Sequence, residues 1–436
     1  MPAKNTLFLT IATIYISYIF IPIVFDLTGI TINIISIVVT LLLVILYPKA
    51  LINKTFLWFC VYVLVLLFYL MIGKGLSIPG VMYATEANRL ITEVGMILPT
   101  LLIYSILIYL NDLSLLKKIA LVSLISTLIT FIYLIPLIIV NSNILRISLG
   151  ANFRSMYIGM PTYPAMHSYV IVLPSLLFIF KYAKGWLKYI FLTITGLYLY
   201  IIFNASITTT LLIALFIIMF FLLYRNNLKK TMQILGVVVL FVFFLHASDL
   251  LINVFDFGVS VTEGTYSQGK FEGFRDAYLT GQKSSSMAER DKLHTISYKS
   301  FLKSPLWGLD TKQIDLRNTD ADFTIQSSNA VIGGHSSLID RLGGMGLLGF
   351  VPFIMIIVTS VKTWKKFFRS KNAWYFYCVG IGAAGILLYT KGLFGQEGWF
   401  TMMVFLPTLT LSRLTYLRRK NISRVLKDIH NDRKLL

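Results

Sequence analysis

Charged residues are scarce in this chain, and acidic ones are the scarcest. Only 13% of the 436 residues are charged, whereas an ordinary soluble domain has about a quarter. The two cysteines, Cys60 and Cys378, lie inside apolar runs, which excludes a disulfide framework and a cysteine-based metal site. The chain also lacks a Gly-x-x-x-x-Gly-Lys phosphate loop and a His-Glu-x-x-His pair. We therefore expect neither ATP hydrolysis nor zinc chemistry, and no metal or cofactor.

Long apolar runs dominate what is present. The chain is 57% hydrophobic, with a mean hydropathy of +0.77. Runs of about 17 to 25 apolar residues, long enough for a helix to cross a bilayer, recur from end to end. We predict an all-α polytopic membrane protein with about 12 transmembrane helices. They are expected at residues 7–26, 29–47, 55–73, 94–110, 117–140, 166–181, 188–203, 205–224, 231–248, 338–361, 373–390 and 397–412.

The basic residues indicate the orientation of these spans. With the N-terminus in the cytoplasm, the inner face receives 24 Lys and Arg residues, and the short outer loops receive five. Positive charge on the inside is the rule for short loops, so both termini are predicted to be cytoplasmic. The net charge of +20 then follows from this asymmetry and from a basic tail at 413–436, which suits anionic lipid. The positive net charge therefore gives no reason to expect a nucleic-acid partner.

The spans divide the chain into four segments. Residues 1–248 hold the first nine helices, 249–337 form a large outer loop, 338–412 hold three more helices, and 413–436 form the tail. An outer loop of 89 residues is uncommon unless it is functional. Within it, "SMAERDKLHTISYKSFLKSP" predicts one helix, because Ser286 and Glu289 have capping-box spacing and Pro305 ends the run. We expect the rest of the loop to be irregular.

The stretch "GGHSSLIDRLGGMGLLGF", residues 333–350, places His335, Asp340 and Arg341 where this loop enters a span. Polar groups at the edge of hydrocarbon are costly and call for a reason. A helix start favours an anion, arginine suits phosphate oxygens, and a histidine can take a proton from a hydroxyl. Four further arginines are expected on the outer face: Arg146, Arg154, Arg275 and Arg290. The pattern favours transfer chemistry on a lipid-linked phosphate or diphosphate.

Simpler roles remain open for each of these residues. Arg146 and Arg154 can extend to lipid headgroups, and Arg275 can be an ordinary surface charge. Arg341 can pair with the adjacent aspartate or anchor the helix end. His335 can be a plain helix cap, and the nearby glycines can serve close helix packing. The span interiors are almost free of ionisable residues, which disfavours ion-coupled transport.

The same stretch resembles the signature of the O-antigen polymerase and O-antigen ligase superfamily, the Wzy/WaaL-like GT-C glycosyltransferases. In that family a His followed by Asn or Ser begins the membrane helix after a large periplasmic loop. Here His335-Ser336 is followed by Leu338 and by "GLLG" at 346–349. The match is to a pattern of residue types around one loop–helix junction.

Two upstream runs extend the resemblance. "ERDKLHTISYKSFLKSPLWGLD" is similar to a family run with Arg290, Pro305 and Gly308 in register, and "FRSMYIGMPTYPAMHSYVIVLP" places Arg154 in the family's first arginine loop. One departure stands out, because "NASITTT" at 204–210 occupies the place where many members have Ser-Arg-Gly. An arginine is therefore missing there, and a phosphate site would depend on the other cations.

The resemblance implies a GT-C-like fold in the bacterial inner membrane with a periplasmic active site. The implied reaction is an inverting, metal-independent transfer of a growing glycan from undecaprenyl diphosphate to a lipid-linked repeat unit. His335 would activate the acceptor hydroxyl, and Arg290 would act with it on the diphosphate. Arg154, Arg275 and Arg146 are further candidates for binding the diphosphate.

The variant "GHSSLID" favours a polymerase over a ligase that transfers glycan to lipid A–core. A Wzz-type chain-length regulator is a possible partner of a polymerase. A polysaccharide flippase is a third interpretation, since twelve spans suit one. The 89-residue loop and the empty span interiors stand against it.

Overall fold

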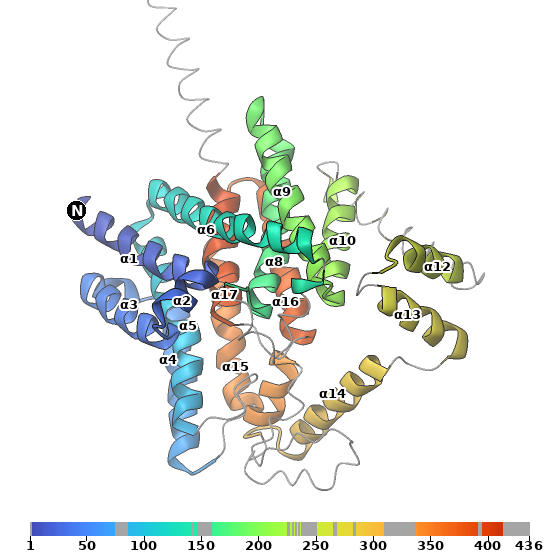
Figure 1. Ribbon diagram of the computed structural model, residues 1–436. Coiled ribbons are helices and arrows are strands. Elements are labelled where there is room, and N and C mark those ends of the chain that lie inside the picture. Colours follow the sequence, from blue (N-terminus) through green and yellow to red (C-terminus); the bar gives the residue numbers. More distant parts are fainter. Residues whose placement is uncertain are drawn as a thin grey trace, which may run out of the picture.

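The protein was examined as a computed structural model (Figure 1). It describes residues 2–74, 86–141, 143–145, 159–224, 227–228, 251–264, 268–281, 285–308, 336–390 and 395–412, with isolated helical positions at 231, 233 and 236. Within these ranges the regular structure is helical and no strand occurs. The expectation of an all-α chain is therefore confirmed.

Among the described residues, seven helices are long and apolar enough to cross a membrane, or eight if a bent pair near the N-terminus counts as one span. They are α4 (Lys54–Met71), α5 (Glu86–Leu110), α6 (Leu113–Val140), α8 (Tyr163–Tyr182), α9 (Trp186–Ala205), α15 (Ser337–Lys365) and α16 (Lys371–Thr390). This set is compatible with a polytopic membrane protein. Twelve full spans are not confirmed by it.

The remaining predicted spans are shorter or interrupted. α3 (Ile32–Leu46) and α10 (Thr208–Leu223) are apolar helices of 15 and 16 residues. The last predicted span begins as α17 (Gly395–Phe400), turns into a π-helical segment at Thr401–Phe405 and continues as helix to residue 412. The predicted span at 231–248 lies outside the described residues apart from three isolated helical positions.

The first predicted span, 7–26, is two helices rather than one. α1 (Pro2–Phe20) and α2 (Pro22–Thr28) meet at an angle of 96°. Pro22 explains the break, since proline has no N–H to continue a helix and disfavours helical geometry in the residue before it. Hydrophobicity alone did not reveal this bend.

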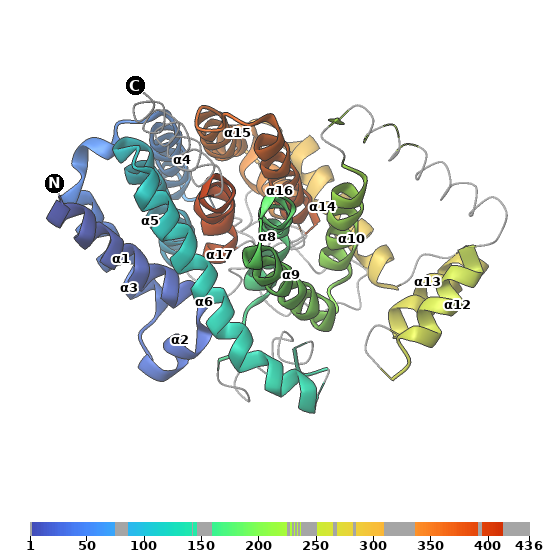
Figure 2. The same ribbon diagram turned by 90° about the horizontal axis from the view of Figure 1, so that it is seen from above.

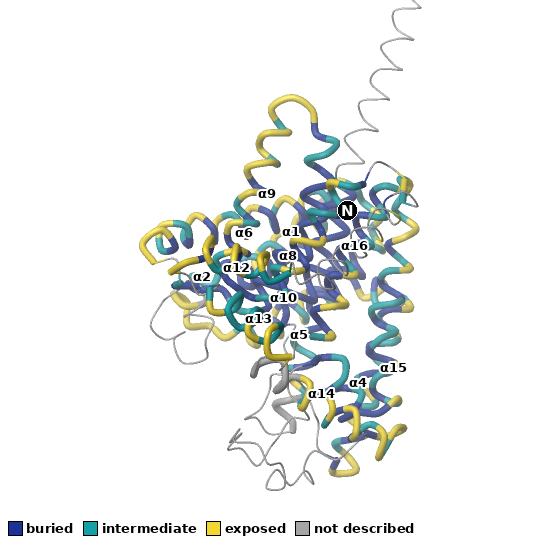
Figure 3. Tube along the Cα trace, turned by 90° about the vertical axis from the view of Figure 1, so that its right-hand side faces the viewer, coloured by how far each residue is buried: buried dark blue, intermediate teal, exposed yellow. Residues whose placement is uncertain are grey.

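The core of the bundle is built around α8, whose side chains are buried on nearly every face. Figure 3 shows buried residues grouped in the interior and exposed ones along the projecting end of α9. Many large apolar side chains point outward, such as Leu57 and Leu64 on α4 and Leu192 on α9. Extended apolar surface is rare on soluble monomers, so this exterior suits contact with lipid.

Part of the predicted outer loop is more helical than expected. α12 (Leu251–Val261) and α13 (Gln268–Thr280) form a hairpin that Figures 1 and 2 show beside the bundle, on the side of α10. Gly258 allows the close approach of the Phe271 ring, because a Cβ there would lie 2.4 Å from it. Lys270 anchors the hairpin through a hydrogen bond to the carbonyl of Ser206, between α9 and α10.

The one helix expected in this loop is present as α14 (Ser285–Lys303). It ends just before Pro305, as the sequence predicted. α14 packs against the first turns of α15, so the large loop returns to the bundle before the chain re-enters it. This contact builds the candidate site.

Candidate functional site

The first turns of α15 are separated from the rest of the helix by a break at Gly346. This residue has φ of +59°, a left-handed conformation that side chains other than glycine rarely adopt. A Cβ on it would lie 2.5 Å from the backbone of Leu306 and of Gly308, which itself has φ of +72°. The two glycines therefore allow the chain that follows α14 to pass directly against the broken helix.

Backbone N–H groups after the break are satisfied by that passing chain. Leu347 donates to the carbonyl of Pro305 at 2.8 Å, and Leu348 donates to the carbonyl of Leu306 at 3.1 Å. A break deprives these N–H groups of their usual carbonyl partners within the helix, and the carbonyls of the passing chain replace them. The end of α14 is thus hydrogen-bonded to the middle of α15.

Carbonyl groups before the break are satisfied by the end of α4. Lys74 Nζ donates to the carbonyl of Gly344 at 2.6 Å, and the Tyr69 hydroxyl donates to the carbonyl of Met345 at 2.7 Å. The Lys74 ammonium also lies 4.1 Å from the centre of the Tyr69 ring, a cation–π distance. α4 and α14 therefore hold the first turns of α15 from two sides.

Asp340 fastens α14 to the start of α15. Its Oδ1 accepts from the Ser297 hydroxyl of α14 at 2.7 Å, and its Oδ2 accepts from the Ser336 N–H at 2.9 Å. The Ser336 side chain in turn caps α15 by accepting from the N–H of Ile339 at 3.0 Å. All three polar side chains are buried, where such hydrogen bonds are expensive to lose.

Arg341 and Glu93 form a buried ion pair below this cap. Arg341 Nη2 lies 2.7 and 2.9 Å from the two carboxylate oxygens of Glu93, and the side chains are 5% and 1% exposed. Tyr62 of α4 donates to Glu93 Oε1 at 2.9 Å, and the guanidinium carbon lies 4.3 Å from the centre of the Phe353 ring. The Ser337 carbonyl accepts from Nη1 at 3.1 Å. Nε alone has no hydrogen-bond partner among the described residues.

This pair corrects two expectations. Arg341 was expected to pair with Asp340 or to anchor the helix end, but its ionic partner is Glu93 of α5. α5 begins at Glu86, so Glu93 lies two turns inside the helix rather than in the loop before it. Four ionisable side chains are therefore buried around the start of α15: Lys74, Glu93, Asp340 and Arg341.

Most of the candidate residues chosen from the sequence lie outside the described part of the chain. This applies to His335, Arg146 and Arg154, and to the side chain of Arg290, whose backbone belongs to α14. The structure does, however, describe their neighbours. Ser336 directly follows His335, and Ser297 lies two helical turns after Arg290.

Arg275 is the one candidate cation with a described side chain. It lies on α13, with Nη1 3.5 Å from Asp256 of α12 and Nε 3.3 Å from Asp276. The hydrogen bond to Asp276, followed by that to Asp256, raises the pKa of Arg275 above its usual value. The structure therefore places Arg275 in an exposed ion cluster of the α12–α13 hairpin, and not beside the cap of α15.

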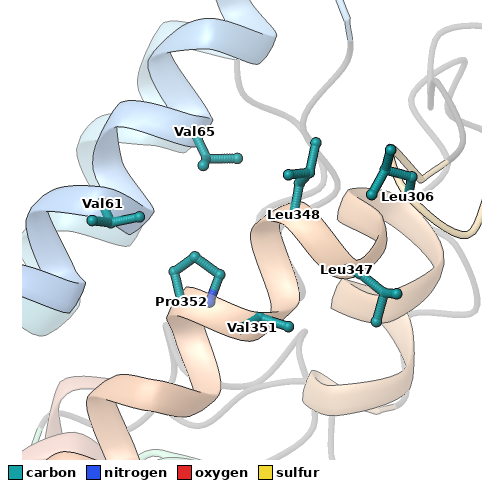
Figure 4. A pocket seen from close by; sticks show the side chains of 7 residues that line it. All are labelled: Val61, Val65, Leu306, Leu347, Leu348, Val351 and Pro352. Atoms are coloured by element: carbon teal, nitrogen blue, oxygen red, sulfur yellow. The ribbon is translucent and has the colours of Figure 1, made fainter.

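An apolar groove adjoins the polar start of α15 (Figure 4). Its volume is about 330 Å³. Figure 4 shows Val61 and Val65 of α4 across from Leu348 and Pro352 of α15, with Leu306 at the end nearest the break. Leu347 and Val351 complete the lining. The apolar groove and the buried polar start of α15 thus lie on the two sides of the break at Gly346.

Comparison with known proteins assigns no family to this arrangement. No protein-family model matches the chain, and a search of curated proteins finds no match. The function must therefore be argued from the residues and their geometry.

Proposed function

We propose that this chain polymerises a bacterial surface polysaccharide such as O-antigen. It would transfer the growing glycan from undecaprenyl diphosphate to a lipid-linked repeat unit at the periplasmic face of the inner membrane. One observation carries the proposal: Asp340 joins Ser297 of α14 to Ser336 at the cap of α15. The helix that contains Arg290 is thereby fastened to the residue that follows His335.

The proposed reaction has one bond forming and one breaking. An acceptor hydroxyl attacks the anomeric carbon of the donor, its proton passes to His335, and the bond from that carbon to the diphosphate breaks with inversion. Arg290, with Arg154 and Arg146, would neutralise the leaving diphosphate, because guanidinium groups bind phosphate oxygens in a bidentate manner. Arg275 is the weakest of the proposed cations, since its donors already face Asp256 and Asp276.

The groove beside the break supports a lipid-linked substrate. An undecaprenyl chain is wholly apolar while its diphosphate is anionic, so such a substrate needs adjacent surfaces of both kinds. We propose that the isoprenoid lies between Val61, Val65 and Leu348, and that the diphosphate lies toward the start of α15. A GT-C-like architecture is part of the same proposal.

Two alternatives make different products. A ligase would use the same residues to transfer finished glycan to lipid A–core. A flippase gains some support from the buried Glu93–Arg341 pair, because ionisable groups inside a bundle often mark transport paths. However, a buried ion pair that is further bonded by Tyr62 and Ser337 is well suited to positioning α15.

The deciding experiment compares cells that lack the chain with cells that carry His335→Ala, at equal protein level. For a polymerase, both show a single repeat unit on lipid A–core, because ligation continues without polymer. Bare core with long polymer on undecaprenyl diphosphate identifies a ligase, and lipid-linked repeat units confined to the cytoplasmic face identify a flippase. Normal long chains with His335→Ala would make this histidine a mere helix cap. Ser260→Ala, on the exposed surface of α12, serves as the matched control.

A further inference from the structure

A second cavity, of about 260 Å³, is lined by Thr92 and Met96 of α5, the helix that also carries Glu93 of the ion pair. It is bounded by the facing ends of α1, α2, α3, α5, α8 and α17, all predicted to lie at the outer face. Its lining is Tyr18, Ile19, Pro22, Ile32, Asn33, Thr92, Met96, Thr162, Pro164, Gly395, Gln396 and Glu397. Thr92 is the chain neighbour of Glu93, so the cavity and the ion pair lie on adjacent faces of the same turn of α5.

The carboxylate of Glu397 is held in a defined position in this cavity. Thr162, which caps α8, donates from its hydroxyl to Glu397 Oε1 at 2.7 Å. Gly395 has φ of +64°, and a Cβ there would lie 2.6 Å from Pro164 and 2.8 Å from Glu397 Oε2. Only glycine at 395 leaves room for the carboxylate to turn back over the start of α17.

The wall beside Glu397 is fixed by a buried amide. Gln396 Nε2 donates to the Ser36 hydroxyl of α3 at 3.2 Å and to the Gly95 carbonyl of α5 at 3.3 Å. These bonds tie the first turn of α17 to two other helices. This wall of the cavity is therefore fixed without a ligand, which lowers the ordering cost of binding.

The lining chemistry selects among ligand classes. None of the lining residues that the structure describes is basic, so these residues offer a phosphate or diphosphate no counter-charge. The lining combines a carboxylate, two amides, two threonine hydroxyls and the ring of Tyr18. A carboxylate accepts strong hydrogen bonds from hydroxyl groups, and amides both donate and accept. This set matches a neutral, hydroxyl-rich ligand with one apolar face.

We propose that this cavity binds one sugar ring of the acceptor glycan, with Glu397 accepting hydrogen bonds from its hydroxyl groups. The proposal rests on the proposed function, because it assumes that a glycan reaches the outer face. The volume lies below the range of about 300–1,000 Å³ that is usual for drug-sized ligands, which suits a single ring. Glu397 would orient the acceptor while chemistry occurs at the start of α15.

The test measures occupancy directly. In a chain with Cys60 and Cys378 replaced by alanine, Asn33→Cys places a thiol at the exposed edge of the cavity. Its rate of labelling by a membrane-impermeant maleimide is measured in nanodiscs. The probe is the lipid-linked repeat unit extracted from cells lacking this chain. We expect the repeat unit to slow labelling at least fivefold, whereas undecaprenyl diphosphate without sugar leaves the rate unchanged. Ser260→Cys, on α12, is the control thiol and should be unaffected by either.

The Glu397→Gln variant tests whether protection of the thiol depends on the carboxylate. Loss of a charge-assisted hydrogen bond is expected to raise the half-protecting concentration about tenfold, with an unchanged melting temperature as proof of folding. Glu263→Gln, an exposed acid after α12, should leave that concentration unchanged. Equal protection by undecaprenyl diphosphate alone would make the cavity a lipid site and overturn the proposal. Full protection of the thiol in the Glu397→Gln protein would also overturn the proposal.

The outcome separates this proposal from the proposed function. Glycan-dependent protection that needs Glu397, in a protein whose absence leaves long polymer intact, would keep the sugar site and reject the polymerase. Loss of polymer without the chain, together with no protection of the thiol at 33, would keep the polymerase and reject the sugar site. If sodium ions slow the labelling and the repeat unit has no effect, the cavity is a cation site, and the sugar-site proposal is rejected.

Discussion

Arg341 and Glu93 face each other across 248 positions of sequence, with both carboxylate oxygens of Glu93 within 2.9 Å of Arg341 Nη2. The first residue belongs to α15 and the second to α5, so their contact fixes the depth at which α15 begins. A shift of α15 by one turn would move Arg341 by about 5.4 Å and break it. The pair therefore sets where the chain leaves the large loop before α15 and enters the bundle.

Removal of one partner should destabilise the protein far more than removal of both. Glu93→Ala leaves a buried cation, and we expect it to lower the free energy of unfolding by about 3–5 kcal/mol. Replacing both, as Glu93→Leu with Arg341→Met, should recover most of this loss. Thermal unfolding in detergent measures the effect.

The exposed ion cluster around Arg275 on α13 serves as the control for the buried Glu93–Arg341 pair. Arg275→Ala breaks contacts to Asp256 and Asp276 at the surface, and exposed ion pairs contribute little to stability because solvent screens them. Similar losses for Glu93→Ala and Arg275→Ala would show that the buried pair does not position α15.

Gly346 should tolerate no side chain. Gly346→Ala adds a Cβ 2.5 Å from the backbone of Leu306, and the left-handed conformation costs a further ~1–3 kcal/mol. We expect a lower melting temperature and loss of polymer in cells. Gly385→Ala on α16, where no atom lies within 4 Å of the new Cβ, should leave both unchanged. A Gly346→Ala protein as stable as the parent would contradict the described packing.

The predicted orientation can be checked with two single thiols in the background without Cys60 and Cys378. Ser260→Cys on α12 should react with an impermeant reagent added to the periplasmic side. Lys184→Cys, at the exposed turn between α8 and α9, should react only after the membrane is opened. The reverse pattern would invert the topology and remove every functional assignment made above.

Arg290 and His335 should act as one unit. If the arginine binds the diphosphate and the histidine takes the acceptor proton, both serve one transition state, and their losses should not add. Arg290→Lys should fail nearly as badly as Arg290→Ala, because a point charge does not replace a bidentate fork. Polymer length in cells measures each variant and the double variant. Independent, multiplicative losses would argue against a shared transition state.

Chelation should leave the reaction unaffected. Arginines can neutralise a diphosphate without a metal ion, so we expect EDTA to change the rate of polymer formation by the purified chain less than twofold. The assay follows extension of the lipid-linked repeat unit on a gel. Loss of activity with EDTA, restored by one specific divalent ion, would refute the metal-independent mechanism.

Hydropathy and turn signals predicted the helical architecture because both are local. The capping spacing at Ser286 and the stop at Pro305 predicted α14, and apolar runs predicted the seven long helices. The bend at Pro22 and the extra helices α12 and α13 were missed. The first depends on geometry within an apolar run, and the second on a hairpin whose packing, such as Gly258 against Phe271, is tertiary.

The site was harder to predict because its bonds join distant segments. The sequence drew attention to the start of α15, but the partners of Arg341, Gly344 and Met345 come from α4 and α5. No local pattern links Lys74 to Gly344. One signal was available, since Glu93 and Arg341 have opposite charge and stand at the outer ends of two predicted spans. The cavity around Glu397 gave no local signal.

The break in α15 also has a consequence for biogenesis. The carbonyl that Lys74 binds belongs to Gly344, which is synthesised 270 residues later. At ~5–20 residues per second, translation needs roughly 15–50 s to cover that interval. The early helices must therefore remain without their final partner during that interval, and α15 and the helices after it pack onto helices that have already formed. Truncated chains that end before α15 should accordingly become substrates for membrane proteases rather than partly active enzymes.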